Sequence, residues 1–114
     1  MPTYIMLTRL TAYGSQSLTQ DPDRLSAVNE EVQSYGCRVL AQYATIGPYD
    51  FVNIIDAPDN ETIAVLSAAL SSRGTVSILT MPAVGVGQFV DKLKTRSDTV
   101  TPTRRRSRRT DTPR

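Results

Sequence analysis

The chain has 114 residues, enough for one small domain, and its charges are divided unevenly along its length. Eight of the 13 basic residues but only two of the 11 acidic residues lie from residue 94 onward, so this tail carries +6 and residues 1–93 carry −4. The absence of histidine and the single cysteine exclude histidine-based catalysis, histidine metal sites, intrachain disulfides and cysteine-cluster zinc sites. We therefore expect an acidic domain followed by a basic tail.

The first half of the domain is predicted to form a strand, a helix and a second strand. Residues 4–10 are rich in strand formers, and residues 11–15 predict a turn or a short helical start. Asp21-Pro22 predicts the start of a helix, because Asp accepts from free backbone amides and Pro fits the first helical position. Gly36 ends that helix, and residues 37–44 predict the second strand.

The second half of the domain repeats this pattern. Residues 47–50 interrupt the second strand, and residues 51–56 predict a third strand that pairs with it as a hairpin. Residues 57–59 begin another helix, which ends at Gly74, and residues 75–81 predict the fourth strand. The order strand, helix, strand, strand, helix, strand predicts an α+β, ferredoxin-like fold with a four-stranded antiparallel sheet and both helices on one face.

The end of the chain differs in composition from the domain before it. Residues 85–94 predict a short helical or docking segment, and we place the domain within residues 1–93. Residues 94–114 are dominated by Ser, Thr, Pro and Arg, which cannot bury enough apolar surface to offset the entropy lost on ordering. The sequence therefore predicts a disordered, Arg-rich tail over residues 94–114.

The sheet is predicted to have a second apolar face. Strand alternation favours Ile5 and Leu7 of the first strand, and Val52 and Ile54 of the third, as the residues that face the helices. The opposite face would then present a large apolar patch, which is typical of an interface. We expect a homodimer joined through its sheets, or a monomer with this face half covered by residues 85–94. The candidate interface residues are Tyr4, Met6, Phe51, Ile55, Leu79 and Met81.

The segment from Tyr43 to Val52 resembles the GYD-domain family of small proteins, which is named for the Gly, Tyr and Asp found here at positions 47, 49 and 50. Residues 2–8, 21–25 and 57–59 are also similar to the family, and the resemblance covers about residues 1–90. It implies a dimeric α/β barrel of the ferredoxin-like type and no established activity. Its relatives in fold include cofactor-free monooxygenases, isomerases, lyases and regulatory ligand-binding modules.

The Gly-Pro-Tyr-Asp segment has two interpretations. In the structural one, Gly47 and Pro48 make a turn, Asp50 accepts from loop amides and Tyr49 covers the sheet edge. In the functional one, Tyr49 and Asp50 lie at the mouth of a pocket, where they bind a polar ligand or transfer a proton if burial raises the carboxyl pKa. The candidate ligand-binding residues are Thr8, Tyr43, Gly47, Tyr49, Asp50 and Asn53.

Three functions remain open from the sequence. The first is a homo-oligomeric small-molecule-binding module with its pocket between the two sheets. The second is a cofactor-free enzyme, monooxygenase-like or isomerase-like, that uses Tyr49 and Asp50. The third is contact with a polyanion through the arginine run at residues 104–109. We expect no cofactor, no metal, no membrane contact, and no nucleic-acid binding beyond a weak contact of the tail. The lone thiol of Cys37 and the lack of a basic-apolar leader favour a structural cysteine and a cytoplasmic protein.

Overall fold

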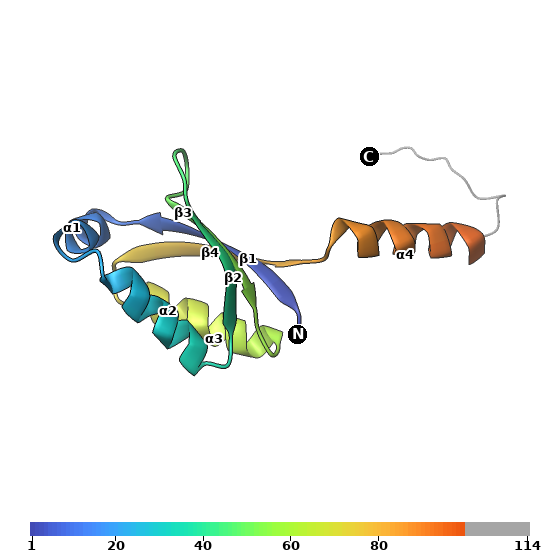
Figure 1. Cartoon of the computed structure of the whole chain (residues 1–114), viewed down its shortest axis with the longest axis horizontal. Coiled ribbons are helices and arrows are strands. Elements are labelled where there is room, and N and C mark those ends of the chain that lie inside the picture. The colour runs from blue at the N-terminus through green and yellow to red at the C-terminus, as the bar shows by residue number, and fades with distance from the viewer. Residues whose placement is uncertain (100–114) are drawn as a thin grey trace. The chain divides into compact units, whose positions relative to one another are not determined.

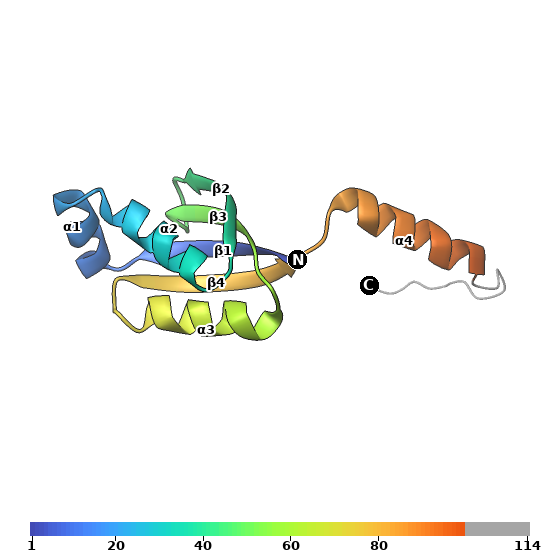
Figure 2. The same cartoon turned by 60° about the horizontal axis from the view of Figure 1, so that its bottom comes forward.

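Four antiparallel strands form a single sheet in the spatial order β2-β3-β1-β4. The computed structural model describes residues 1–99. Figure 2 shows the strands in this order, and Figure 1 shows α2 and α3 together on one side of the sheet. The predicted α+β class and the ferredoxin-like arrangement of the sheet are confirmed. The elements are β1 Thr3–Leu10, α1 Ala12–Gln20, α2 Arg24–Ser34, β2 Arg38–Ala44, β3 Phe51–Asp56, α3 Asn60–Ser71, β4 Val76–Ala83 and α4 Val86–Thr99.

The helix ends follow local rules for the most part. Gly36 and Gly74 adopt positive φ angles of 79° and 76° behind α2 and α3, as their positions predict. The Asp59 carboxylate caps α3 by accepting from the Thr62 amide at 2.8 Å, and this hydrogen bond is the main cause that lowers the pKa of Asp59. The Asp21-Pro22 prediction is two residues early: α2 begins at Arg24, and Asp23 precedes it as the N-cap residue.

A whole helix, α1, occupies the segment for which the sequence predicts only a turn or a helical start. The Thr11 hydroxyl accepts from the Gly14 amide at 3.0 Å and donates to the carbonyl of Gly74 at 2.7 Å. The Thr11 amide also donates to the Thr75 carbonyl at 3.0 Å. The start of α1 is therefore fixed by contacts with the two residues that precede β4, which lie far away in the sequence.

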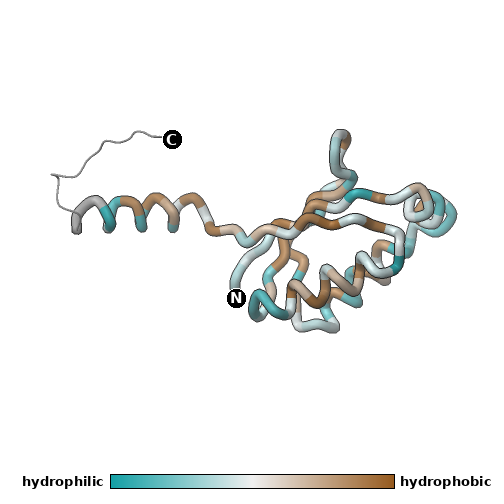
Figure 3. The backbone as a smooth tube through the Cα atoms, turned by 180° about the vertical axis from the view of Figure 1, so that it is seen from behind, coloured by the Kyte–Doolittle hydropathy of each residue, from teal (hydrophilic) through white to brown (hydrophobic). Residues whose placement is uncertain are grey.

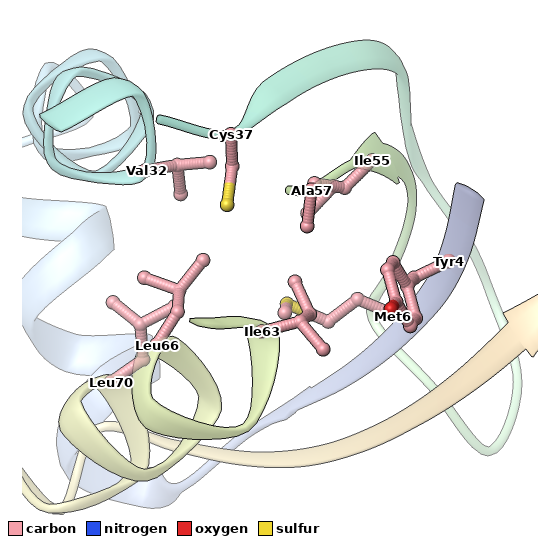
Figure 4. Packing of buried hydrophobic residues seen from close by; sticks show 9 residues of the cluster. All are labelled: Tyr4, Met6, Val32, Cys37, Ile55, Ala57, Ile63, Leu66 and Leu70. Carbon is pink, nitrogen blue, oxygen red and sulfur yellow. The ribbon is translucent and has the colours of Figure 1, made fainter. Parts of the chain in front are cut away.

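The hydrophobic core lies between the sheet and the helices (Figure 4). Tyr4, Met6 and Ile55 are only 1–2% exposed there. The predicted facing of β1 and β3 is therefore wrong: Tyr4, Met6, Phe51 and Ile55 lie on the helix-facing side. Both sides of these two strands are apolar, so alternation alone did not distinguish them. The remaining residues of the core cluster are Val32, Cys37, Ala57, Ile63, Leu66 and Leu70.

The other side of the sheet carries two apolar rows that the strand register defines. Leu7 pairs with Val52 on one side and Leu79 on the other, and Ile5 pairs in the same way with Ile54 and Met81. Leu79 and Met81 are 46% and 38% exposed, and their predicted facing is confirmed. We call these six residues the open sheet face. Figure 3 shows the alternation of apolar and polar stretches along the backbone that contains them.

Residues 1–83 form one compact unit, and a second begins at Val84. The helix α4 of this second unit begins at Val86, within the predicted helical or docking segment of residues 85–94, and continues to Thr99. Residues 94–99 are therefore helical, where the sequence predicts disorder. Its apolar side chains recur at helical spacing and are 37–76% exposed at Val86, Phe89, Val90 and Leu93. The rest of the predicted tail, residues 100–114, lies outside the described residues.

Candidate functional site

A cavity of about 120 Å³ lies between the helix-facing side of the sheet and the helices α1 and α2. Its walls are mostly apolar: Met6 and Ile78 contribute from the sheet, Leu18 from α1, and Leu25 and Val28 from α2. The cavity is formed within one chain. Its position differs from the predicted pocket between two sheets, because the polar residues expected on that outer face point toward the helices instead.

A chain of neutral polar side chains crosses the cavity lining from β1 to α2. Asn53 donates to the Thr8 hydroxyl oxygen and to the Met6 carbonyl, at 3.4 Å in each case. Gln42 donates to the Asn53 side-chain oxygen at 2.8 Å. Asn29 and Gln42 exchange two hydrogen bonds, at 3.1 and 3.3 Å. These contacts fix the amide groups relative to one another without using any charge.

Thr8 and Asn53 are the buried polar residues of this arrangement, and each is 7% exposed. The Thr8 hydroxyl oxygen accepts from Asn53, but its own proton has no acceptor among the residues that the structure describes. A buried hydroxyl donor without a partner is costly, because it has given up its hydrogen bonds to water. The Thr8 hydroxyl is therefore a donor available to whatever occupies the cavity.

Two arginines are the charged residues in the lining. Arg73 is engaged by Glu31, with a 2.5 Å contact from Nη1 to Oε1 and a second, parallel contact. This side-chain hydrogen bonding lowers the pKa of Glu31 and raises that of Arg73. Arg24 lines both the cavity and a surface pocket bordered by Asp21 and Asp23, and no ion pair involves its guanidinium among residues 1–99.

The Gly-Pro-Tyr-Asp loop is bound to the end of β1 rather than to the cavity. Asp50 accepts from the Leu10 amide at 2.7 Å through its carboxylate, and its own amide donates to the Thr8 carbonyl at 2.8 Å. Arg9 donates to the Pro48 carbonyl at 2.8 Å and lies 5.3 Å from the centre of the Tyr49 ring. These contacts give the loop a structural role.

Residues 4–92 of the chain match the family model described as the GYD domain. The chain belongs to the GYD domain family. It is also similar to a Thermus thermophilus protein named "Glutamine synthetase and cystathionine beta-lyase binding protein", with 44% identity over 95 residues that cover 82% of this chain and 100% of the relative. A crystal structure of a Thermus thermophilus protein has 24% identity and a TM-score of 0.48, over 75% of this chain and 95% of the other.

In this GYD domain protein, only part of the predicted ligand-binding set meets at the cavity. Thr8 and Asn53 line it, whereas Gly47, Tyr49 and Asp50 belong to the loop and line neither described pocket. Tyr43 pairs with Val52 beside the open sheet face and is 61% exposed.

Three residues of the lining, Asn29, Gln42 and Arg24, were not predicted from the sequence. The available signal was the spacing of Asn29, which lies four residues after Leu25 on the apolar stripe of α2. Gln42 gave no such signal, because the β-bulge between Val39 and Ala41 changes which side of the sheet it faces.

The remaining groups of the GYD domain protein with possible nucleophilic or metal-binding chemistry are its thiol and its carboxylates. Burial raises the pKa of the Cys37 thiol, and the negative charge of Asp59 raises it further by a smaller amount. This thiol is therefore a poor nucleophile. Residues 1–99 contain no cluster of three potential His, Cys, Asp or Glu ligands. In that same range, no helix has the length and apolar character needed to cross a membrane.

Proposed function

We propose that this protein binds a partner enzyme, and that glutamine synthetase is the first partner to test. The observation that carries this proposal is the 44% identical relative, whose name states this binding and whose full length aligns with this chain. Cystathionine beta-lyase is the second candidate, on the same support. We place the interaction in the cytoplasm, the compartment in which an unpaired thiol such as Cys37 is usual.

The binding experiment uses the full chain and the two enzymes from its own organism. Immobilised glutamine synthetase is expected to give saturable binding in biolayer interferometry, and cystathionine beta-lyase is measured in parallel. An unrelated enzyme of similar charge serves as the control. Equal signals from the control and both enzymes, or no signal from either enzyme, would contradict the proposal.

We also propose that two copies associate through the open sheet face. The support is the pair of cross-strand rows centred on Leu7 and Ile5, which form a contiguous apolar surface with Leu79 and Met81 exposed. A buried dimer interface would remove this surface from water. The two sheets would then face each other, as the family resemblance implies.

Sedimentation at micromolar concentration tests the dimer. Leu79→Asp places a charge on the open sheet face and is expected to shift the protein to monomer. Val65→Asp is the matched control, since Val65 is 58% exposed on α3, outside that face. A monomeric parent chain, or an equal effect of both substitutions, would rule out this interface.

Small-molecule binding is a second candidate function, and the cavity lined by Thr8, Gln42 and Asn53 favours it. The support is the combination of a mostly apolar cavity with a buried Thr8 hydroxyl whose proton has no acceptor within residues 1–99. The catalytic alternative has less support, because Tyr49 and Asp50 are engaged in loop contacts outside the cavity. Contact with polyanions through residues 104–109 stays a prediction, tested by removing residues 100–114 and measuring salt-sensitive binding to a polyanion.

A further inference from the structure

The cavity volume limits the size of an occupant. A cavity of roughly 150 Å³ lined by apolar side chains holds one benzene molecule. The volume here is about 120 Å³, and most of the lining is aliphatic or aromatic. A ligand with an apolar body of about six or seven non-hydrogen atoms fits these dimensions.

The network of Thr8, Asn53, Gln42 and Asn29 in the lining has two hydrogen-bond donors that it does not use. The Thr8 hydroxyl proton has no acceptor among residues 1–99, and only one of the two Asn29 amide protons is used. The oxygens of Asn53 and Gln42 already accept hydrogen bonds from within the network. An occupant that presents acceptor oxygens would therefore satisfy more of the site than one that presents donors.

The charged residues of the lining also favour an occupant that presents acceptor oxygens, and in particular an anion. No acidic residue lines the cavity, and its two charged residues are both arginines. Arg73 is engaged by Glu31, so of the two arginines that line the cavity Arg24 is the one without an ion pair to a described residue. Arg24 is an exposed residue that also lines the outer surface pocket, together with the acids Asp21, Asp23 and Glu31.

We propose that this cavity binds a small carboxylate with an apolar body, with Arg24 pairing with the carboxylate and Thr8 donating a hydrogen bond to it. This inference rests on the small-molecule function proposed above and names its ligand class. An arginine can form two parallel hydrogen bonds with a carboxylate, which favours this anion over a neutral acceptor of similar size.

The test uses three probes of similar shape and different charge. Benzoate, benzyl alcohol and benzylamine are titrated into the isotope-labelled full chain, and binding is followed by the backbone and side-chain amide signals of the protein. Benzoate is expected to bind most tightly and to shift the side-chain amides of Asn53 and Gln42, which line the cavity. Benzyl alcohol is expected to bind more weakly, and benzylamine least.

Variants of two arginines test whether Arg24 causes the preference for a carboxylate. Arg24→Gln is expected to weaken benzoate binding by about tenfold or more, as loss of a charge-assisted hydrogen bond predicts, and to change benzyl alcohol binding little. Arg24→Lys should recover part of the loss. Arg38→Gln removes the same charge outside the cavity lining and should leave benzoate binding unchanged. The amide spectrum of each variant verifies that it is folded.

Several results would overturn the proposal. Binding of none of the probes would mean that the cavity holds water only, and equal binding of all three would remove the charge preference. An unchanged affinity of Arg24→Gln for benzoate would remove Arg24 from the site. Val28→Phe fills the cavity and is expected to abolish binding of every probe. Unchanged benzoate binding in this variant would place the ligand outside the cavity. Enzyme binding is measured separately, so its persistence without carboxylate binding would contradict this inference alone.

Discussion

The Asp50 carboxylate accepts a 2.7 Å hydrogen bond from the backbone amide of Leu10, and so joins the start of β3 to the last residue of β1. The Asp50 amide donates in turn to the Thr8 carbonyl, so the two segments are linked in both directions. The residue that the family motif highlights therefore closes the hairpin loop onto the sheet. It also holds the backbone of Thr8, which lines the cavity, without lining the cavity itself.

Removing this carboxylate should destabilise the fold. Asp50→Ala is expected to lower the free energy of unfolding by about 1.5–3 kcal/mol, because a charged acceptor is lost and the Leu10 amide is left without its partner. Asp50→Asn keeps an acceptor oxygen and should lose less. Urea unfolding followed by circular dichroism measures both variants. A change below about 0.5 kcal/mol for Asp50→Ala would show that water replaces the contact.

A second prediction concerns Gly14, where α1 touches the start of β4. A Cβ atom at this position would lie 1.9 Å from the Thr75 carbonyl oxygen, so α1 has to move if Gly14→Ala is to fold. We expect a lower unfolding temperature and weaker probe binding, because Gly14 lines the cavity. Gly87→Ala is the control, since a Cβ there meets no atom within 4 Å. Equal stability of the two variants would contradict the close packing.

A third prediction is that the Thr8 hydroxyl contributes more to ligand binding than to the stability of the fold. Thr8→Val keeps the shape of the side chain and removes a hydroxyl whose proton has no acceptor in residues 1–99. The long 3.4 Å contact from Asn53 is the hydrogen bond lost, so the change in stability should stay below about 1 kcal/mol. Benzoate affinity should fall severalfold, as measured by amide titration. A large loss of stability with unchanged affinity would reverse these roles.

The pH dependence of stability should include a contribution from Asp56. The pKa of Asp56 is lowered mainly by a hydrogen bond from Thr3 at 2.9 Å, and a hydrogen bond from Arg38 lowers it further. A carboxyl with a lowered pKa in the folded state stabilises the protein above its unfolded pKa of about 3.9, and this contribution is lost as the pH falls through the folded value.

Asp56→Asn should therefore unfold less steeply with acid below about pH 4, although it is less stable than the parent chain at neutral pH. Thermal unfolding measured from pH 2 to pH 7 checks this prediction. Arg38→Gln is expected to cause a smaller change in the same direction, because the hydrogen bond from Thr3 to the Asp56 carboxylate remains in this variant. If the unfolding temperatures of Asp56→Asn and the parent chain fall equally steeply with acid, Asp56 does not contribute to the pH dependence of stability.

The sequence predicted the four strands along the chain and the ends of two helices, because those signals are local. Gly36 and Gly74 adopt the positive φ angles that their positions behind apolar-periodic segments indicate. The α1 helix was not predicted in full, since its start depends on contacts between Thr11 and the Gly74–Thr75 backbone. A contact between segments so far apart in the sequence leaves no local pattern.

The candidate site was predicted only in part for related reasons. Thr8 and Asn53 were identified from their polar character within apolar strands, and they do line the cavity, although on the opposite side of the sheet from the predicted one. Gln42 was missed because the bulge after Val39 breaks the two-residue alternation of β2. The motif residue Asp50 was ambiguous, since a loop carboxylate serves equally well as a ligand group or as a backbone acceptor.

The neutral amide network has a consequence for how the cavity would respond to its surroundings. The lining consists of apolar side chains, hydroxyls, amides and two arginines, and it contains no carboxyl, imidazole or thiol group. The lining therefore presents to an occupant no group of a type that ordinarily titrates near neutral pH. Occupancy by a carboxylate would report the concentration of that metabolite and would not be confounded by acidity, provided that the metabolite itself stays ionised.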